Sequence, residues 1–128
     1  MNLHDYFETT EGTGILATSN SAGLVDVAIY SRPHVTDDNT AAFIMRKHLS
    51  HENLQSNPHA AFMFIEKGPG YKGKRLYLTK LREETDPALI DSLRRKPSKT
   101  YADPDVKSFL VYFQIDRVRP LVGDKEKE

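Results

Sequence analysis

Hydrophobic and polar residues alternate over several short stretches of the chain, and this two-residue period predicts β-strands. The first two stretches flank the polar residues 20–23, a composition typical of a hairpin turn. Within the second stretch Val25, Val27 and Ile29 share one face and mixed residues share the other, which suits the wall of a barrel. The predicted strands cover residues 14–19, 24–30, 40–46, 59–66, 75–83 and 108–121.

Three short segments carry helix signals instead. Residues 2–10 place apolar side chains at the spacing of one helical face, and Asn2 is expected to cap that helix. Ser50 is expected to cap a second helix that ends before Pro58. Asp86 followed by Pro87 is expected to open a third helix, with the aspartate as its cap.

The order of these elements indicates a mainly β fold. A helix, three strands, a short helix, two strands, a helix and a strand predict a six-stranded β-barrel with short helices at its ends. A parallel βαβ repeat is not visible, which argues against a Rossmann domain. We expect a single domain over residues 1–128, with a frayed charged tail at residues 124–128.

Composition removes several classes of function. The chain has 128 residues and no cysteine, which excludes disulfides and thiolate chemistry. Lys plus Arg and Asp plus Glu both number 18, so no net charge favours nucleic acid or an anionic membrane. The apolar runs are too short to span a bilayer, and the first residues do not resemble a secretory signal. We therefore expect a cytoplasmic protein without a nucleic-acid or membrane partner.

A glycine-rich segment at residues 68–75 has the GxxxxGK spacing of a phosphate-binding loop. Arg75 stands where that motif needs a serine or threonine to bind magnesium, and a strand is predicted to follow in place of a helix. Two interpretations remain, a plain hairpin tip and a basic lid over an anionic ligand, and the lid is favoured.

The histidines and serines do not form a recognisable reactive centre. His48 and His51 lie three residues apart, but a third metal ligand at sensible spacing is missing. Ser50 has neither a base partner nor the glycines of a nucleophile elbow. We therefore predict no metal site and nominate no catalytic residue.

A more informative group stands where the third predicted strand leads into the second helix. Arg46 and Lys47 end the strand, and Ser50 and Asn53 fall in the following helix. Helix N-terminal amides attract anions, and adjacent cations and a hydroxyl suit a phosphate. The alternative interpretation, an exposed basic pair beside a capped helix, stays open on these residues alone.

Taken in order, the segments GTGILATSNSAGLVDVAIY and TAAFIMRKHLSHENLQSNPHAAFMFI resemble the pyridoxamine 5′-phosphate oxidase-like flavoproteins. In that family a strand reading approximately G-x-L-A-T opens the barrel, and a later short helix ends in N-L-x-x-N-P. The resemblance covers residues 3–66, with weaker agreement to about residue 119. The matching residues are Gly14, Leu16, Ala17, Thr18, Asn53, Leu54, Asn57 and Pro58.

The resemblance implies an FMN-binding split barrel that forms a homodimer, with the cofactor at the dimer interface. The family's second strand lines the isoalloxazine ring, which by position implies Val27, Ala28 and Ile29 here. The resemblance also implies oxidoreductase chemistry on a small-molecule substrate or with an electron carrier. The flavin itself would supply this chemistry.

The phosphate site of the family lies at the end of the third strand and the start of the helix. Tyr71 and Lys72 of the glycine-rich segment are then expected to reach the cofactor from the partner chain. By position, the phosphate contacts implied here are Ile44, Met45, Arg46, Ser50 and Asn53.

Two departures from the family pattern shape the expected function. The family's cationic group stands nearer the Asn-Leu pair than Arg46 and Lys47 do, so phosphate binding is expected to be rearranged. The chain is also shorter than the true oxidases, so oxidation of the vitamin itself is not expected. The alternatives are the same fold binding haem or a deazaflavin, and a dimeric scaffold without a cofactor.

Overall fold

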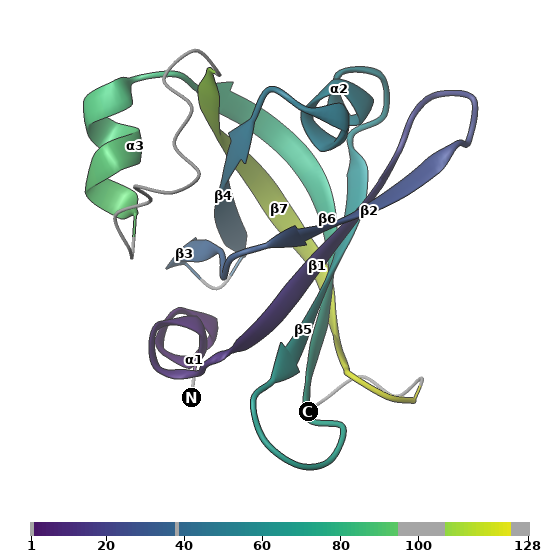
Figure 1. The fold of residues 1–128 in the computed structure, drawn as a ribbon, viewed down its shortest axis with the longest axis vertical. Coiled ribbons are helices and arrows are strands. Elements are labelled where there is room, and N and C mark those ends of the chain that lie inside the picture. The colour runs from purple at the N-terminus through teal and green to yellow at the C-terminus, as the bar shows by residue number, and fades with distance from the viewer. Residues whose placement is uncertain (1, 38, 95–106, 124–128) are drawn as a thin grey trace.

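The computed structural model describes residues 2–37, 39–94 and 107–123. They form a seven-stranded antiparallel sheet that curls around its own core (Figure 1). The strands are β1 (Gly12–Ser19), β2 (Val25–Tyr30), β3 (His34–Asp37), β4 (Thr40–Arg46), β5 (His59–Glu66), β6 (Gly73–Glu84) and β7 (Ser108–Pro120). Their order across the sheet is β2-β1-β5-β6-β7-β4-β3.

The mainly β barrel predicted from the sequence is confirmed, but the predicted number of strands was wrong. The additional strand is β3, whose four residues are too few for a clear alternating pattern. Pro33 immediately before it also indicates a break, because proline donates no backbone hydrogen bond. The turn into β4 agrees with expectation, since the Asn39 N–H donates to the Asp37 carboxylate at 2.8 Å.

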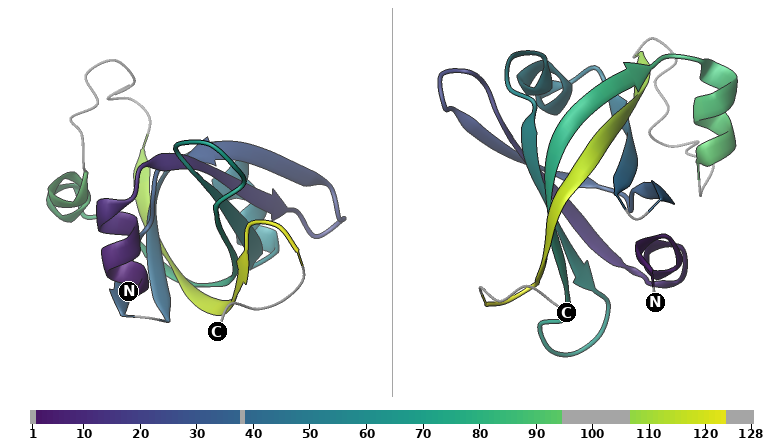
Figure 2. Two further views of the ribbon diagram at one scale, coloured as in Figure 1. Left: turned by 90° about the horizontal axis from the view of Figure 1, so that it is seen from below. Right: turned by 180° about the vertical axis from the view of Figure 1, so that it is seen from behind.

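Three helices lie around the barrel (Figure 2). The side chain of Asn2 caps α1 (Leu3–Thr9), and the side chain of Asp86 caps α3 (Pro87–Leu93), each by accepting a backbone N–H. Both caps follow from the sequence. Within the described part of the chain, no helix is long and apolar enough to cross a membrane.

The remaining helix, α2 (Leu49–Ser56), corrects one expectation. Its N-cap residue is His48, which makes no side-chain capping hydrogen bond, and Ser50 lies inside the first turn. Ser50 is only 3% exposed. Ser50 is not the helix cap because it is the second residue of the helix, and its hydroxyl hydrogen-bonds to Tyr30 of β2 instead.

Phenylalanine rings fill the interior of the barrel. Phe43, Phe62 and Phe113 are all buried and meet edge to face, with the Phe43 centroid 5.0 Å from Phe62 and 5.6 Å from Phe113. Phe7 attaches α1 to the same cluster, 6.2 Å from Phe62. Replacing one such ring by alanine typically costs about 3 to 5 kcal/mol. This core fixes the strands that surround the site described below.

The barrel is open along one seam. β2 and β3 are the two edge strands of the sheet, joined by residues 31–33. β3 pairs with residues 40–42 of β4 only, so residues 43–46 are paired on the β7 side alone. Among the described residues, no strand bridges β2 to this half of β4. The seam therefore lies between two strand edges whose outward backbone groups have no strand partner.

The apolar face of β2 points away from the barrel. Val25, Val27 and Ile29 are 81%, 68% and 80% exposed, whereas Ala28 and Tyr30 between and after them are partly covered. The predicted division of β2 into two faces is therefore observed. The apolar residues of β2 face outward, whereas apolar residues of a strand usually face the core.

Candidate functional site

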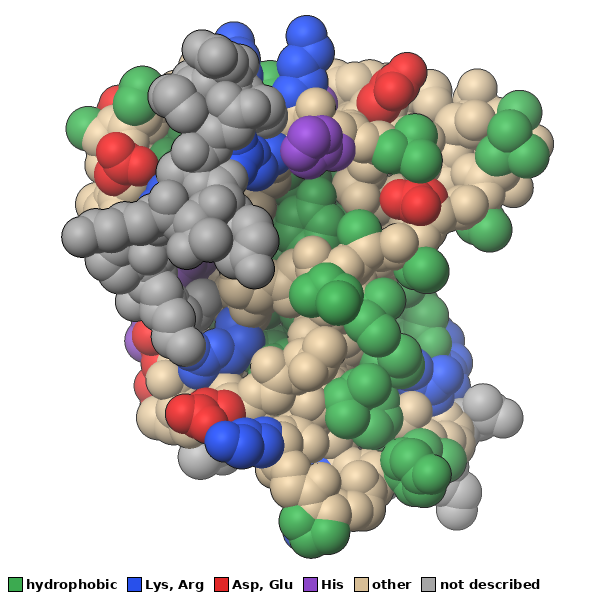
Figure 3. All heavy atoms as spheres, viewed as in Figure 1, with side chains coloured by type: hydrophobic (Ala, Val, Ile, Leu, Met, Phe, Trp, Pro, Cys, Tyr) green, Lys and Arg blue, Asp and Glu red, His purple; other side chains and the backbone are tan. Residues whose placement is uncertain are grey.

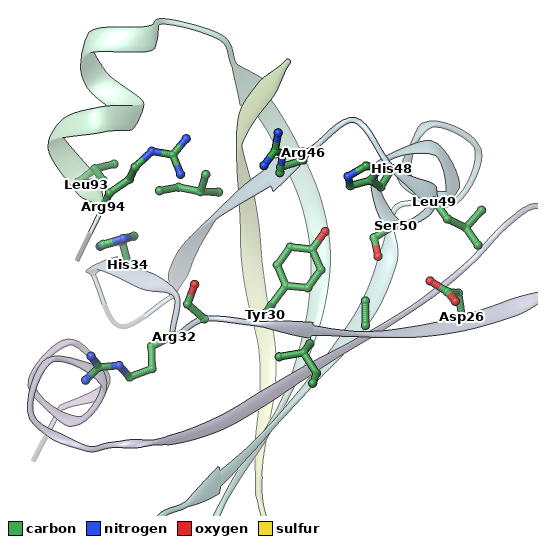
Figure 4. A pocket seen from close by; sticks show the side chains of 14 residues that line it. Asp26, Tyr30, Arg32, His34, Arg46, His48, Leu49, Ser50, Leu93 and Arg94 are labelled. Carbon is green, nitrogen blue, oxygen red and sulfur yellow. The ribbon is translucent and has the colours of Figure 1, made fainter. Parts of the chain in front are cut away.

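A pocket of about 600 Å³ occupies the seam (Figure 4). β2 forms one wall, the end of β4 and the start of α2 form the other, and the end of α3 borders it. The space-filling view shows a hollow with hydrophobic side chains at its floor and basic and histidine side chains on its upper rim (Figure 3). Its polar lining includes Asp26, Tyr30, Arg46, His48, Ser50 and Arg94.

Tyr30 and Ser50 meet across the middle of the pocket from opposite walls (Figure 4). A hydrogen bond links their side chains, and the Tyr30 ring stands edge-on to Phe43 with centroids 6.3 Å apart. Burial raises the pKa of Tyr30, the Ser50 hydrogen bond lowers it, and the nearby Asp26 carboxylate raises it further. The net pKa is raised, so Tyr30 is a neutral phenol at neutral pH.

The junction between β4 and α2 supplies a cationic end to the pocket. Arg46 is the last residue of β4, and the His48 N–H donates to its carbonyl oxygen at 2.8 Å. This tight turn separates Arg46 from the start of α2 by two residues, and Arg46 and Ser50 both line the pocket. A guanidinium, a hydroxyl and a helix N-terminus therefore gather where a bound anion would be stabilised.

The far side of α2 is tied to the sheet by an ionic network. His51 Nε2 lies 3.0 Å from the Glu83 carboxylate, and Lys80 Nζ lies 2.9 Å from the same group. Burial pushes the pKa of Glu83 upward, but the hydrogen bonds from Lys80 and His51 together outweigh it and lower the pKa. The network holds the helix that carries Ser50, without itself lining the pocket.

The pocket brings together part of the set predicted to bind the cofactor. Ala28 and Ile29 line it from β2, Ile44 and Arg46 from β4, and Ser50 from α2. These residues come from three separate elements, so the predicted ring and phosphate contacts converge on a single cavity.

The other predicted residues lie elsewhere in the chain. Met45 is fully buried in the core, because alternation along β4 places its side chain on the opposite face from Ile44 and Arg46, which line the pocket. Asn53 is also buried and donates to a threonine hydroxyl of β1 at 3.1 Å, and Val27 faces outward. Tyr71 and Lys72 lie on the β5–β6 hairpin, at the opposite end of the barrel from α2 (Figure 1).

Several lining residues were not predicted. Tyr30 shares a face of β2 with Asp26 and Ala28, so the two-residue period already carried a signal for it. His34 and Arg94 come from β3 and from the end of α3, far from the other residues in sequence. Only the tertiary structure places them at the seam.

Comparison with known proteins gives matches in structure but not in sequence. No family model matches the chain, and no curated protein matches it. An FMN-binding protein from Syntrophomonas wolfei superposes with a TM-score of 0.77 at 17% identity, over 97% of this chain and 86% of that one. An F420 reductase gives 0.69 at 14% identity, over 90% and 94% of the two chains. A pyridoxinephosphate oxidase family protein from Clostridium acetobutylicum gives 0.65 at 14%, over 89% and 82%.

These matches establish the fold. The chain has the split-barrel fold of FMN-binding and pyridoxamine 5′-phosphate oxidase-like proteins, so the resemblance inferred from its sequence is confirmed at that level. An F420 reductase shares the same fold. Because one fold carries different cofactors, the assignment of a cofactor depends on the chemistry of the pocket.

Proposed function

We propose that this chain is an FMN-binding flavoprotein, an oxidoreductase of the pyridoxamine 5′-phosphate oxidase-like type that acts in the cytoplasm on a small molecule or an electron carrier. The observation that carries the proposal is the pocket in the seam, where two strand edges without partners lead to Arg46 and Ser50. The isoalloxazine ring takes the seam, and the phosphate takes the α2 end.

The seam suits a flavin ring in both shape and polarity. The polar edge of an isoalloxazine carries alternating carbonyl and N–H groups, which the unpaired backbone groups of β2 and β4 can match. Ala28, Ile29 and Ile44 supply apolar contacts to the ring. When bound, the flavin supplies the redox chemistry, and these residues bind and orient it.

The α2 end suits the phosphate. Arg46 offers a guanidinium that donates several hydrogen bonds, and Ser50 offers a hydroxyl held in place by Tyr30. The helix N-terminus adds a favourable dipole for a negative group. The cation shifted back to Arg46 thus stands beside the same cavity as the hydroxyl, which supports phosphate binding despite the altered spacing.

The outer face of β2 supports the proposal of a homodimer. Along the strand register the exposed Ile29 neighbours Ile15 of β1, and Ile15 neighbours Met63 of β5; Ile15 and Met63 are half-buried, so the apolar surface continues from β2 across β1 to β5. Figure 3 shows hydrophobic side chains gathered on the side where β1 and β2 lie. Contiguous exposed apolar surface marks an interaction site. A second copy of the chain related by a two-fold axis is the proposed occupant.

A dimer through this face would place the cofactor at the interface. Ile29 belongs both to the outer face and to the pocket lining, so a partner docked on β2 comes directly beside the pocket. The partner's hairpin is then the proposed source of Tyr71 and Lys72, because within one chain this hairpin lies at the opposite end of the barrel from α2. In this proposal no nucleic acid or membrane takes part.

The direct test is titration of the purified protein with FMN, followed through flavin absorbance and fluorescence. We expect saturable binding with one FMN per chain, and weaker binding by R46Q. The matched control R82Q removes an exposed cation from β6, where Arg82 pairs with Glu84 outside the pocket lining, and is expected to bind like wild type. Absence of binding by the wild type contradicts the proposal.

A deazaflavin is the second candidate, favoured by the structural likeness to an F420 reductase. A deazaflavin presents the same alternating carbonyl and N–H edge to the seam, so the strand edges do not distinguish the two cofactors. A competition experiment does distinguish them. If F420 displaces bound FMN and binds with the lower dissociation constant, the deazaflavin is favoured. A Soret shift with added hemin would favour haem.

A further inference from the structure

Arg94, at the C-cap of α3, lies beside Arg46 although the two come from different parts of the chain. Both side chains line the seam pocket, and Figure 4 shows both guanidinium groups directed toward its upper part. An Nη2 of Arg94 lies 3.5 Å from the hydroxyl of Ser108. Ser108 is the residue of β7 paired directly with Arg46 of β4. The two guanidinium groups therefore approach the same point of the sheet.

The position of Arg94 is built into the fold. The α3 helix docks on the sheet through Ile90, which is 2% exposed and packs with Ala42 and Leu110. The side chain of Asp91 lies 3.2 Å from Arg94 Nε and holds that edge of the guanidinium. The remaining N–H groups of the Arg94 guanidinium are thereby turned toward β7 and the pocket, a geometry suited to a charged acceptor.

The surroundings concentrate positive charge at this corner. The exposed Lys47 follows Arg46, and its backbone N–H donates to the carbonyl of Lys107 at 3.0 Å, which extends the β4–β7 ladder. The chain as a whole has a net charge of zero, so this concentration is local. Among the described residues that line the pocket, Asp26 supplies the one carboxylate, and it lies on the other side of Ser50 (Figure 4).

We propose that Arg94 and Arg46 form a two-sided clamp for the phosphate monoester of the bound cofactor. The inference rests on the proposed function and adds a residue to it. A phosphate monoester carries up to two negative charges and several acceptor oxygens, so it can accept from two guanidinium groups at once. In this chain the cations stand farther from α2 than in the family pattern. Arg94 of α3 thus supplies a second cation at the phosphate position.

The test compares FMN with riboflavin, which has the same ring and no phosphate. Dissociation constants are measured by fluorescence quenching for wild type, R46Q, R94Q, the double variant and the control R82Q, whose cation lies on β6 outside the pocket lining. We expect R94Q to weaken FMN binding at least tenfold, about 1.4 kcal/mol, and riboflavin binding less than twofold. The fold loss of FMN affinity in the double variant is expected to be smaller than the product of the fold losses in the two single variants, because both cations act on one phosphate group.

Three results would overturn the clamp. R94Q could leave FMN affinity unchanged, it could weaken FMN and riboflavin equally, or its effect could multiply independently with that of R46Q. Circular dichroism and the melting temperature of R94Q establish that a loss of affinity does not come from a loss of fold. R94K keeps a charge but not the planar fork, and is expected to recover only part of the FMN affinity.

Failure of the proposed function has a separate signature. If the wild type binds neither flavin, the flavin assignment fails, and the clamp is then judged with inorganic phosphate alone. Thermal stabilisation of wild type by phosphate that is absent in R94Q supports the clamp, since a ligand stabilises the folded state it binds. Equal stabilisation of both proteins, or of neither, overturns it.

Discussion

The imidazole of His51 lies flat against the ring of Phe109, with centroids 3.8 Å apart and planes 14° from parallel. This contact joins the first turn of α2 to β7, on the side of the helix away from the pocket. Together with the hydrogen bonds from His51 to Glu83, it fixes the helix that presents Ser50. The helix that forms one wall of the pocket is therefore fixed by groups that do not line the pocket.

Glu83→Gln is expected to destabilise the protein at neutral pH and to do so less in acid. The pKa of Glu83 is lowered, so its carboxylate contributes stability above the unfolded-state value of about 4.3. That contribution is lost as the pH falls through the lower folded-state pKa. Hydrogen bonds to a charged group contribute about 1.5 to 3 kcal/mol, so we expect a clear fall in the urea midpoint at pH 7.

Glu84→Gln is the matched control for this experiment. Glu84 is the next residue of β6 and pairs with Arg82 at a more exposed position. Exposed ion pairs contribute little, so the urea midpoint of this variant is expected to stay close to that of wild type. An equal loss in both variants, or a Glu83→Gln effect that does not shrink as the pH is lowered, contradicts the role of the network.

Tyr30→Phe is expected to weaken FMN binding while leaving the barrel folded. The substitution removes the hydroxyl bonded to Ser50 but keeps the ring packed on Phe43. One hydrogen bond contributes about 0.5 to 1.5 kcal/mol, which corresponds to a loss of affinity of roughly 2- to 12-fold. Titration of Y30F, S50A and the double variant checks this, and strictly multiplicative losses would show that the two hydroxyls act separately.

Gly14→Ala is expected to damage the wall of the pocket. A Cβ at this position would lie 2.4 Å from the Tyr30 carbonyl oxygen and 2.5 Å from the Phe62 ring. Overpacking of this kind typically costs about 1 to 3 kcal/mol, here by pushing β1 away from β2. Thermal unfolding measures the loss, with Thr13→Ala, an exposed neighbour on β1, as the control. A stability equal to wild type would contradict the close approach.

Val27→Asp is expected to convert the proposed homodimer into a monomer. Val27 is 68% exposed on the outer face of β2, and a charge there would be buried without a partner in the interface. Light scattering after size exclusion measures the mass. Ser92→Asp adds the same charge on the exposed side of α3 and is expected to leave the mass unchanged. A monomeric wild type would remove the proposed dimer.

Local chemistry made much of this fold predictable from the sequence. The caps at Asn2 and Asp86 follow from side chains that accept hydrogen bonds from the first helical turn. The hairpin between β1 and β2 follows from its polar turn, where Asn20 accepts from the backbone of Ala22. β3 escaped prediction because four residues beside a proline carry too little pattern.

The candidate site was less predictable, because side-chain direction depends on packing. A two-residue period divides β2 into two faces, but it does not say that Val27 faces outward while Ala28 faces the pocket. Ser50 has the chemistry of a cap, but its buried hydroxyl bonds to Tyr30. Arg94 reaches the pocket through the docking of α3, which no local pattern encodes.

The exposed edge strand has a consequence for how the chain behaves at high concentration. β2 combines unpaired backbone groups with the β-branched residues Val25, Val27 and Ile29, a combination that templates strand-on-strand aggregation. A ligand in the seam covers the backbone edge, and a second copy covers the apolar side. Solubility of the protein is therefore expected to rise and fall with the supply of the proposed cofactor.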